Sequence, residues 1–407
     1  MTAHRLIRIV ATALTVAVLA CLAWGVVRII RIAGYRRDLA ARGFPPVYAE
    51  RLARLQYDWP DWRFEPLPVK DISWKQVVEK ECSPAWNLVV YSTWAPDRWS
   101  ASKAANYTPY YAKDAKAYDS GAWYQASREA IAYFLDPRNF LNESDVFMFE
   151  TLGHDAHAQP LEAVERTLSA TFMANAKPKG EHRRFSELIA EVGQRLGVNP
   201  VFLAGRLASE QGGGSPQARG TIGDALTLYY TNATDRIGNA VIWGKRFTRG
   251  NAATTGVMAK GSSAYNGYYN FFNFRAYGLG LFEIAYNAWA EATSKEVCAR
   301  YLGPWTTPAR AIEGGSIMIK ERYIDTRRHT RYLQKFSVLA EAGAYRWKQY
   351  MQNIAAPLVE ARNTARAYAA ADTLGLPHRF LIPVYREMPD DPCPDPASGA
   401  SVYSPSE

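Results

Sequence analysis

One carboxylic acid stands where the surrounding sequence could raise its pKa. Asn199-Pro200 has the residue types of a helix N-cap and first turn, and the apolar residues after it predict a helix that carries Glu210. Gly212 to Gly214 predict the end of that helix. The negative end of a helix and an apolar wall both favour a protonated carboxyl, which a general acid for glycosidic cleavage requires. A solvated glutamate at a helix end fits the same residues.

A second stretch alternates aromatic rings with amides. It is Tyr268-Tyr269-Asn270-Phe271-Phe272-Asn273-Phe274, in a chain with 12 Trp, 25 Tyr and 16 Phe. Flat rings beside amides can stack on sugar faces and hydrogen-bond to hydroxyl groups, although a buried strand or turn fits the same pattern. The candidate substrate-binding residues are Tyr269, Asn270, Phe271, Asn273 and, further along the chain, Tyr323.

Other reactive groups give weaker patterns. Asp224 and Asp235 are candidates for a second carboxylate, but ordinary loop acids fit equally well. His154 and His157 are three residues apart, and we interpret them as part of a solvated loop rather than as metal ligands. Four cysteines, Cys21, Cys82, Cys298 and Cys393, show no zinc-ligand spacing and allow at most one disulfide outside the apolar leader. We expect no metal and no cofactor.

The N-terminus predicts a membrane anchor. No charged residue occurs from Ile9 to Val27, a run close to the length that crosses a bilayer as a helix. Arg28 and three further arginines follow directly, without a clear cleavage site, so an uncleaved anchor is favoured over a signal peptide. Because Arg5 and Arg8 precede the span, charge alone does not fix its orientation.

Composition excludes general disorder and narrows the partners. The 407 residues are 48% hydrophobic and carry a formal net charge of +9, which favours anionic lipid, an acidic wall polymer or nucleic acid. No zinc-finger spacing, RNP-type aromatic motif or compact basic block occurs in the sequence. Nucleic acid is therefore not expected as a partner.

The periodicity predicts a mainly α protein, of α+β class, with a small β or loop lobe. We expect a stalk helix over residues 33–60, a short edge strand at most over 64–69, and a surface loop over 95–125. Residues 211–268 form the predicted small lobe, with a strand-like piece at 240–243. The predicted helices cover residues 123–134, 161–172, 185–196, 199–211, 278–289, a segment through Ile317 and Tyr323, 345–354 and 361–371.

Two of these stretches together resemble a known family. Residues 203–212, Leu-Ala-Gly-Arg-Leu-Ala-Ser-Glu-Gln-Gly, followed some sixty residues later by the Tyr-Tyr-Asn-Phe-Phe-Asn run, look like the catalytic region of family 73 glycoside hydrolases, the bacterial β-N-acetylglucosaminidases that act as autolysins. Further blocks are similar to membrane-anchored members in the same order, at residues 44–48, 62–67, 133–141, 311–315, 332–336, 350–354 and 382–385.

The resemblance implies a lysozyme-like fold and a peptidoglycan substrate. Glu210 matches the family's acid, and Tyr269 matches the tyrosine of its second motif. Residues 273–275, Asn-Phe-Arg, stand where related chains tend to have smaller residues, and residues 327–329, Arg-Arg-His, replace a more neutral turn. The domains expected on this basis are an anchor at 1–38, an N-terminal module and stalk at 39–160, a glucosaminidase domain at 161–385 and a tail at 386–407.

The expected activity is cleavage of the β-1,4 bond between N-acetylglucosamine and N-acetylmuramic acid in peptidoglycan. A lytic transglycosylase would use the same single acid but form an anhydro-muramic end. A non-catalytic peptidoglycan-binding scaffold would use the same groove without cleavage. The expected location is the cytoplasmic membrane, with a single span and the catalytic domain on the extracytoplasmic side. The sequence does not reveal whether a membrane protein is a partner.

Overall fold

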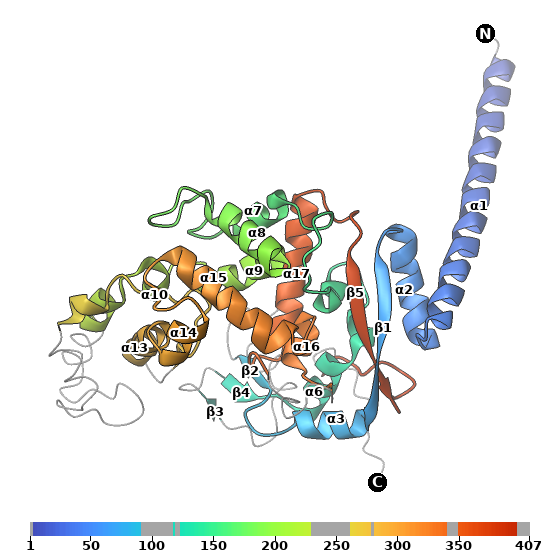
Figure 1. Cartoon of the computed structure of the whole chain (residues 1–407). Helices are drawn as coiled ribbons and strands as arrows, with labels where there is room; N and C mark the ends of the chain where they lie inside the picture. The colour runs from blue at the N-terminus through green and yellow to red at the C-terminus, as the bar shows by residue number, and fades with distance from the viewer. Residues whose placement is uncertain are drawn as a thin grey trace.

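The computed structural model describes residues 3–90, 117–118, 123–228, 261–277, 281–339 and 349–396. Most described residues are helical, so the predicted mainly α class is confirmed. One long helix, α1 (Ala3–Ala41), projects from the body (Figure 1). Residues 12–41 of this helix are long and apolar enough to cross a membrane, by length and composition.

The predicted single stalk helix is wrong, because the chain turns back between two helices. After α1, Gly43 has a positive φ of 106° and Pro45 precedes α2 (Pro46–Asp58). α2 packs against the last turns of α1, where Leu39 and Leu52 are buried (Figure 1). α1 therefore packs directly against the body through α2 rather than being joined to it by a separate linker.

Two small sheets are built from residues of the N-terminal third and the C-terminal end. β1 (Arg63–Ser73) pairs in parallel with β5 (Arg379–Arg386) and is longer than the short edge strand predicted at 64–69. Its prolines, Pro66 and Pro68, are tolerated because each strand of a two-stranded sheet is an edge. The second sheet is antiparallel, in the order β2 (Leu88–Val90), β4 (Trp123–Gln125), β3 (Ala117–Tyr118).

The helices confirm several sequence predictions and correct others. α8 (Phe185–Leu196) and α9 (Pro200–Gln211) are confirmed. The helix predicted from Trp123 begins instead at α6 (Arg128–Leu135), because Ser127 caps it and the three residues from Trp123 form β4. Further helices in the described residues are α3 (Trp74–Glu81), α7 (Leu161–Leu168), α10 (Pro216–Arg219), α13 (Leu281–Ala292), α14 (Lys295–Arg300), α15 (Pro308–Ile319), a π-helical turn (Lys320–Ile324), α16 (Arg331–Lys335) and α17 (Ala356–Ala370). Short 3-10 turns cover Pro137–Phe140, Asp145–Phe149 and Ser262–Tyr265.

One further prediction is corrected. Residues 349–354 are not helical, and the rest of the helix predicted at 345–354 lies outside the described residues. In the small β or loop lobe predicted at 211–268, the described residues 211–228 and 261–268 form short helices, turns and loops. The strand-like piece at 240–243 and most of the loop predicted at 95–125 also lie outside the described residues.

One hydrophobic core joins the N-terminal module to the helices that follow. It includes Leu39 on α1, Phe64 on β1, Leu203 on α9 and Cys393 near the end of the chain. Residues 387–396, predicted as part of a tail, pack on the body, where Arg138 donates to the carbonyl oxygens of residues 389, 390 and 391. The predicted domain boundaries at 38/39, 160/161 and 385/386 stay predictions.

Candidate active site

Glu210 lies in the last turn of α9, where the sequence predicts it. The side chain of Asn199 caps the start of this helix by accepting from the backbone N–H groups of Val201 (2.8 Å) and Phe202 (3.1 Å). Beyond Glu210 the chain leaves the helix, and Gly214 adopts a positive φ of 74°. Glu210 is half-buried as a whole residue.

The surroundings of Glu210 favour the protonated acid. Burial raises the pKa of the Glu210 carboxyl, and the negative charge of Glu360 adds to that effect. A hydrogen bond from Asn273 and the positive charge of Arg206 oppose it, but the net shift of the pKa is upward. A carboxyl with a raised pKa can hold its proton closer to neutral pH, as a general acid must.

Asn273 holds the Glu210 carboxyl in a defined orientation. Its Nδ2 donates to Glu210 Oε2 at 2.9 Å, while its Oδ1 accepts from Gln211 Nε2 (2.7 Å) and Gln217 Nε2 (2.9 Å). The two glutamine donors fix which end of the Asn273 amide faces the acid. Asn273 also has a positive φ of 51°, a conformation that asparagine tolerates better than most residues. Of the predicted substrate-binding residues, this one contacts the acid directly.

Asn270 and Phe271 are buried and shape the loop instead. The Asn270 side chain accepts from the Phe274 N–H (3.0 Å) and donates to the carbonyl oxygens of Phe274 (2.8 Å) and Ala288 (3.3 Å). Phe271 has 0% exposed surface and lies in the hydrophobic core. Both side chains are fully buried in this structure, and their role as sugar contacts stays a prediction.

The two tyrosines predicted as substrate contacts, Tyr269 and Tyr323, are both almost fully buried. Tyr269 is 4% exposed and packs against Gly220, where a Cβ atom would come within 2.7 Å of the Tyr269 hydroxyl. Tyr323 is 8% exposed on the π-helical turn, and its ring centroid is 5.2 Å from that of Tyr350. Burial raises the pKa of both predicted tyrosines, so both are neutral hydroxyl groups near neutral pH.

Sequence reasoning missed the basic and aromatic partners of the acid. Arg206 lies one helical turn before Glu210, and its guanidinium carbon is 4.0 Å from the Tyr350 ring centroid. Burial raises the pKa of Tyr350, and the negative charge of Glu210 raises it further, which places Tyr350 within electrostatic reach of the acid. The spacing of Arg206 and Glu210 by four residues on α9 was the available signal, since residues four apart share a helix face.

A buried ionic network lies behind the acid. Arg206 donates to Glu360 Oε1 on α17 (2.6 Å) and to Gln334 Oε1 on α16 (2.7 Å). Arg331 Nη1 donates to Glu150 Oε2 at 2.9 Å, and its Nε lies 4.0 Å from Glu360 Oε2. These contacts join α9, α16 and α17 into one unit, so the position of Glu210 depends on three separate parts of the sequence.

The structure does not assign a second carboxylate. Asp224 is exposed and accepts from Asn266 Nδ2 at 2.7 Å, so it holds the loop before the aromatic run. Asp235 lies outside the described residues. Within the described ranges, no three His, Cys, Asp or Glu side chains group as metal ligands. His157 is exposed in a turn, as predicted, and the four cysteines are free thiols.

Several solved structures are similar to this chain. The structure of the major bifunctional autolysin is 16% identical, with 79% of this chain and 98% of that chain covered and a TM-score of 0.40. Glucosaminidase B of S. aureus is 15% identical, with 80% and 94% covered and a TM-score of 0.41. Autolysin E of S. aureus is 15% identical, with 72% and 100% covered and a TM-score of 0.40. No protein-family model and no curated protein sequence matches this chain.

Proposed function

We propose that this chain is a peptidoglycan hydrolase in which Glu210 is the general acid. The observation that carries the proposal is the Glu210 carboxyl, whose pKa burial raises and whose Oε2 accepts from a fixed amide donor. The sequence blocks that resemble family 73 glycoside hydrolases supply the substrate class. The bond cleaved is the β-1,4 bond between N-acetylglucosamine and N-acetylmuramic acid.

The geometry suits a proton transfer from Glu210 to the glycosidic oxygen. Asn273 Nδ2 donates to Glu210 Oε2, so Glu210 Oε1 is the oxygen that would carry the proton toward the leaving group. As the bond breaks, positive charge develops on the sugar ring, and the ionised Glu210 that remains is stabilised by the Asn273 donor and the Arg206 charge. The same two groups that oppose a raised pKa in the resting protein therefore favour the product of proton transfer. The group that supplies or directs the water is left unassigned.

We propose that the activity lies on the extracytoplasmic side of the cytoplasmic membrane, where peptidoglycan is found. α1 would be the single membrane span, and glycan strands near the membrane would be the substrate. In this arrangement Asn273 orients the acid rather than the sugar.

The test is digestion of purified peptidoglycan by the full chain in detergent, beside its Glu210→Gln form. The full chain is required because Leu39, the first residue after the predicted anchor, belongs to the core. Loss of a general acid lowers the rate by about 10²–10⁴-fold. The matched control is Glu191→Gln, which changes an exposed glutamate on α8 in the same way.

Products are identified by mass spectrometry after borohydride reduction. Reduced N-acetylglucosamine ends from the unmutated protein and from Glu191→Gln, but not from Glu210→Gln, are the expected result. Anhydro-muramic ends would instead identify the protein as a lytic transglycosylase and refute hydrolysis. Binding of glycan without any cleavage would favour the scaffold and refute the catalytic proposal.

A further inference from the structure

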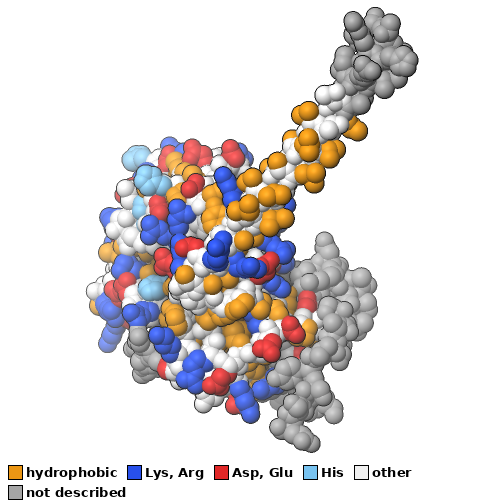
Figure 2. Space-filling view, turned by 90° about the vertical axis from the view of Figure 1, so that its right-hand side faces the viewer, with side chains coloured by type: hydrophobic (Ala, Val, Ile, Leu, Met, Phe, Trp, Pro, Cys, Tyr) orange, Lys and Arg blue, Asp and Glu red, His pale blue; other side chains and the backbone are white. Residues whose placement is uncertain are grey.

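The junction of α1 and α2 carries a concentration of positive charge that the proposed catalytic site does not use. Residues 28–54 contain seven arginines and two acidic residues. Figure 2 shows Lys and Arg side chains around the base of the projecting apolar helix. We call this surface the arginine collar, and its members are Arg28, Arg31, Arg36, Arg37, Arg42, Arg51 and Arg54.

Two cavities open within the collar. The first, of about 550 Å³, lies between α1 and the start of α2, with Arg37 and Arg51 beside apolar groups such as Val47. The second, of about 450 Å³, lies on the α1 side nearer the apolar run, with Arg28 and Arg54 beside Ile32 and other apolar groups. Arg36 and Glu50 line both cavities. Each cavity is therefore lined mostly by carbon, including the aliphatic stems of arginines whose guanidinium groups are available at its rim.

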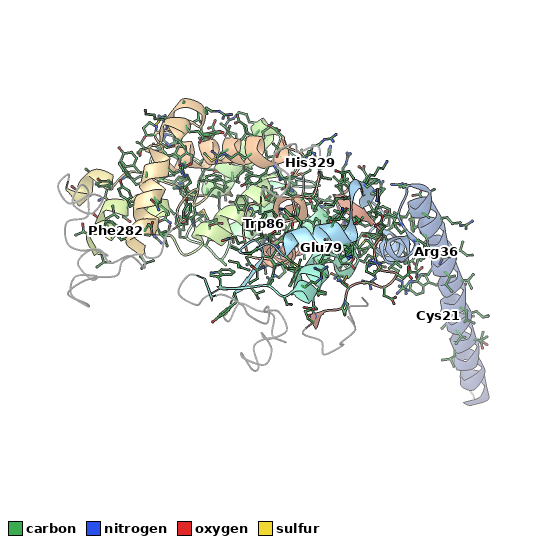
Figure 3. The ribbon with its side chains drawn as sticks, turned by 90° about the horizontal axis from the view of Figure 1, so that it is seen from below. Cys21, Arg36, Glu79, Trp86, Phe282 and His329 are labelled. Carbon is green, nitrogen blue, oxygen red and sulfur yellow. The ribbon has the colours of Figure 1, made fainter. Side chains whose placement is uncertain are left out.

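The collar lies where the predicted membrane span ends. Exposed hydrophobic side chains continue along α1 through Val27 to Ile30, so the first arginines overlap the end of the apolar surface. The Arg28 guanidinium carbon lies 5.7 Å from the Trp24 ring centroid and 5.5 Å from that of Tyr57 on α2. Trp and Tyr are enriched at the height of lipid headgroups. Figure 3 shows Arg36 at the root of the projecting helix and Cys21 further out along it.

The collar's positive charge is only partly neutralised within the chain. Arg36 and Arg54 share one carboxylate, that of Glu50, at 3.3 and 3.0 Å, and both side chains are more than half exposed. Arg37 donates to the backbone oxygen of Ala33 at 3.4 Å. Arg31 is exposed and has no ion pair with any residue that the structure describes. Exposed pairs of this kind add little stability, so the arginines are available to an external anion.

We propose that the two cavities of the arginine collar bind the headgroup phosphates of anionic phospholipids. One guanidinium group can donate two parallel hydrogen bonds to two oxygens of a phosphate. The apolar walls can contact the glycerol and upper acyl carbons of a lipid, which a free phosphate lacks. A bound lipid would contact α1 and α2 together and so hold the body at a fixed angle to the membrane. This inference is independent of the glycosidase proposal, because neither cavity is lined by a residue of the Glu210 site.

The test is titration of the full chain in neutral detergent with phosphatidylglycerol and, separately, phosphatidylcholine, with bound lipid counted by native mass spectrometry. The full chain should bind phosphatidylglycerol in preference. Arg36→Gln/Arg37→Gln should weaken that binding about 30-fold, or about fivefold for each arginine. The matched control is Arg183→Gln/Arg195→Gln, which removes two exposed arginines beside or on α8.

Folding is checked separately, by thermal unfolding of every variant in phosphatidylcholine micelles. If the double variant unfolds early, Arg37→Gln alone replaces it, because Arg37 donates to the backbone oxygen of Ala33. The single variant should weaken binding about fivefold. The proposal would be overturned if the full chain bound the two lipids equally, or if the double variant and its control lost equal affinity for phosphatidylglycerol. Displacement of the bound lipid by 50 mM inorganic phosphate would also overturn it.

Discussion

At the scale of single residues, Asn273 lowers the Glu210 pKa while burial raises it. Asn273→Gly removes the donor without straining the backbone, because glycine adopts the positive φ freely. The Glu210 pKa should then rise further. Since the acid acts when protonated, the alkaline limb of the kcat/KM profile should move to higher pH, and the measurement is kcat/KM on soluble glycan strands from pH 5 to 9.

The matched control is Asn175→Gly, which changes an exposed asparagine with a similar φ of 52°. It should leave the alkaline limb where it is. An unmoved limb in Asn273→Gly as well would show that the hydrogen bond does not act on the titrating acid.

Local signals predicted the acid but not its surroundings. The cap at Asn199 and the glycines after α9 place Glu210 correctly, because both act within a few residues of the helix ends. Alternating rings and amides look the same whether they face a ligand or the core, so the sequence did not predict that Asn270 and Phe271 are buried. Tyr350 contacts Arg206 from far along the chain, a pairing that no local pattern encodes.

At the scale of elements, the buried pair of Arg206 on α9 and Glu360 on α17 should dominate the stability of the site. Arg206→Leu leaves the Glu360 carboxylate in a buried setting without its 2.6 Å partner. The expected loss is about 3–5 kcal/mol in the free energy of unfolding, measured by denaturant titration. Arg206→Leu/Glu360→Leu should lose less than Arg206→Leu alone, because neither charge is then left uncompensated. Additive losses in the two single variants and the double variant would contradict this coupling.

A second buried pair should make stability depend on pH. Burial lowers the pKa of Lys335 on α16 to about 7, and the nearby Glu81 on α3 opposes that shift. Between pH 7 and the ordinary lysine value of about 10.4, the unfolded chain binds a proton that the folded chain lacks. The free energy of unfolding should therefore rise with pH in this window, by at most about 1.4 kcal/mol per pH unit from this group.

The measurement is urea unfolding at pH 7.5, 8.5 and 9.5. Glu81→Gln/Lys335→Met removes both titrating groups, so its slope against pH should be smaller than that of the unmutated chain. Identical slopes would mean that Lys335 keeps its proton throughout this range.

Elements with local signals were predicted well, and elements that depend on distant partners were not. α8 is capped by a left-handed Gly197, which the sequence shows directly. β1 looked like a short edge strand because its partner, β5, lies more than 300 residues away and its own prolines argue against a longer strand. Trp123 fitted a helical face, yet pairing with Val90 made it a strand residue.

At the scale of the whole molecule, the packing of α1 onto α2 would hold the proposed site at a fixed distance from the membrane. Ile32 and Tyr35 on α1 pack against the same core that contains residues of α9. A rigid anchor limits which bonds of a membrane-linked strand reach Glu210. The apolar run predicted a membrane span, but it did not predict the packing of α1 on α2, since the stalk was expected to be one helix.

A fixed attachment of the body to the membrane span can be tested separately from the cleavage reaction of the Glu210 site. Seven helical residues inserted between Arg31 and Ile32 would raise the body by about 10 Å and keep its orientation nearly unchanged, since they make about two helical turns. A seven-residue Gly/Ser insertion at the same place would instead uncouple the body from the anchor.

Both variants should cleave soluble strands at the unmutated rate, because the insertion precedes every contact of Glu210. In vesicles that carry lipid-linked glycan strands, the helical insertion should lengthen the shortest piece of glycan left attached to the lipid. The flexible insertion should broaden the distribution of product lengths. Unchanged product lengths in both variants would mean that substrate, rather than the anchor, sets the position of cleavage.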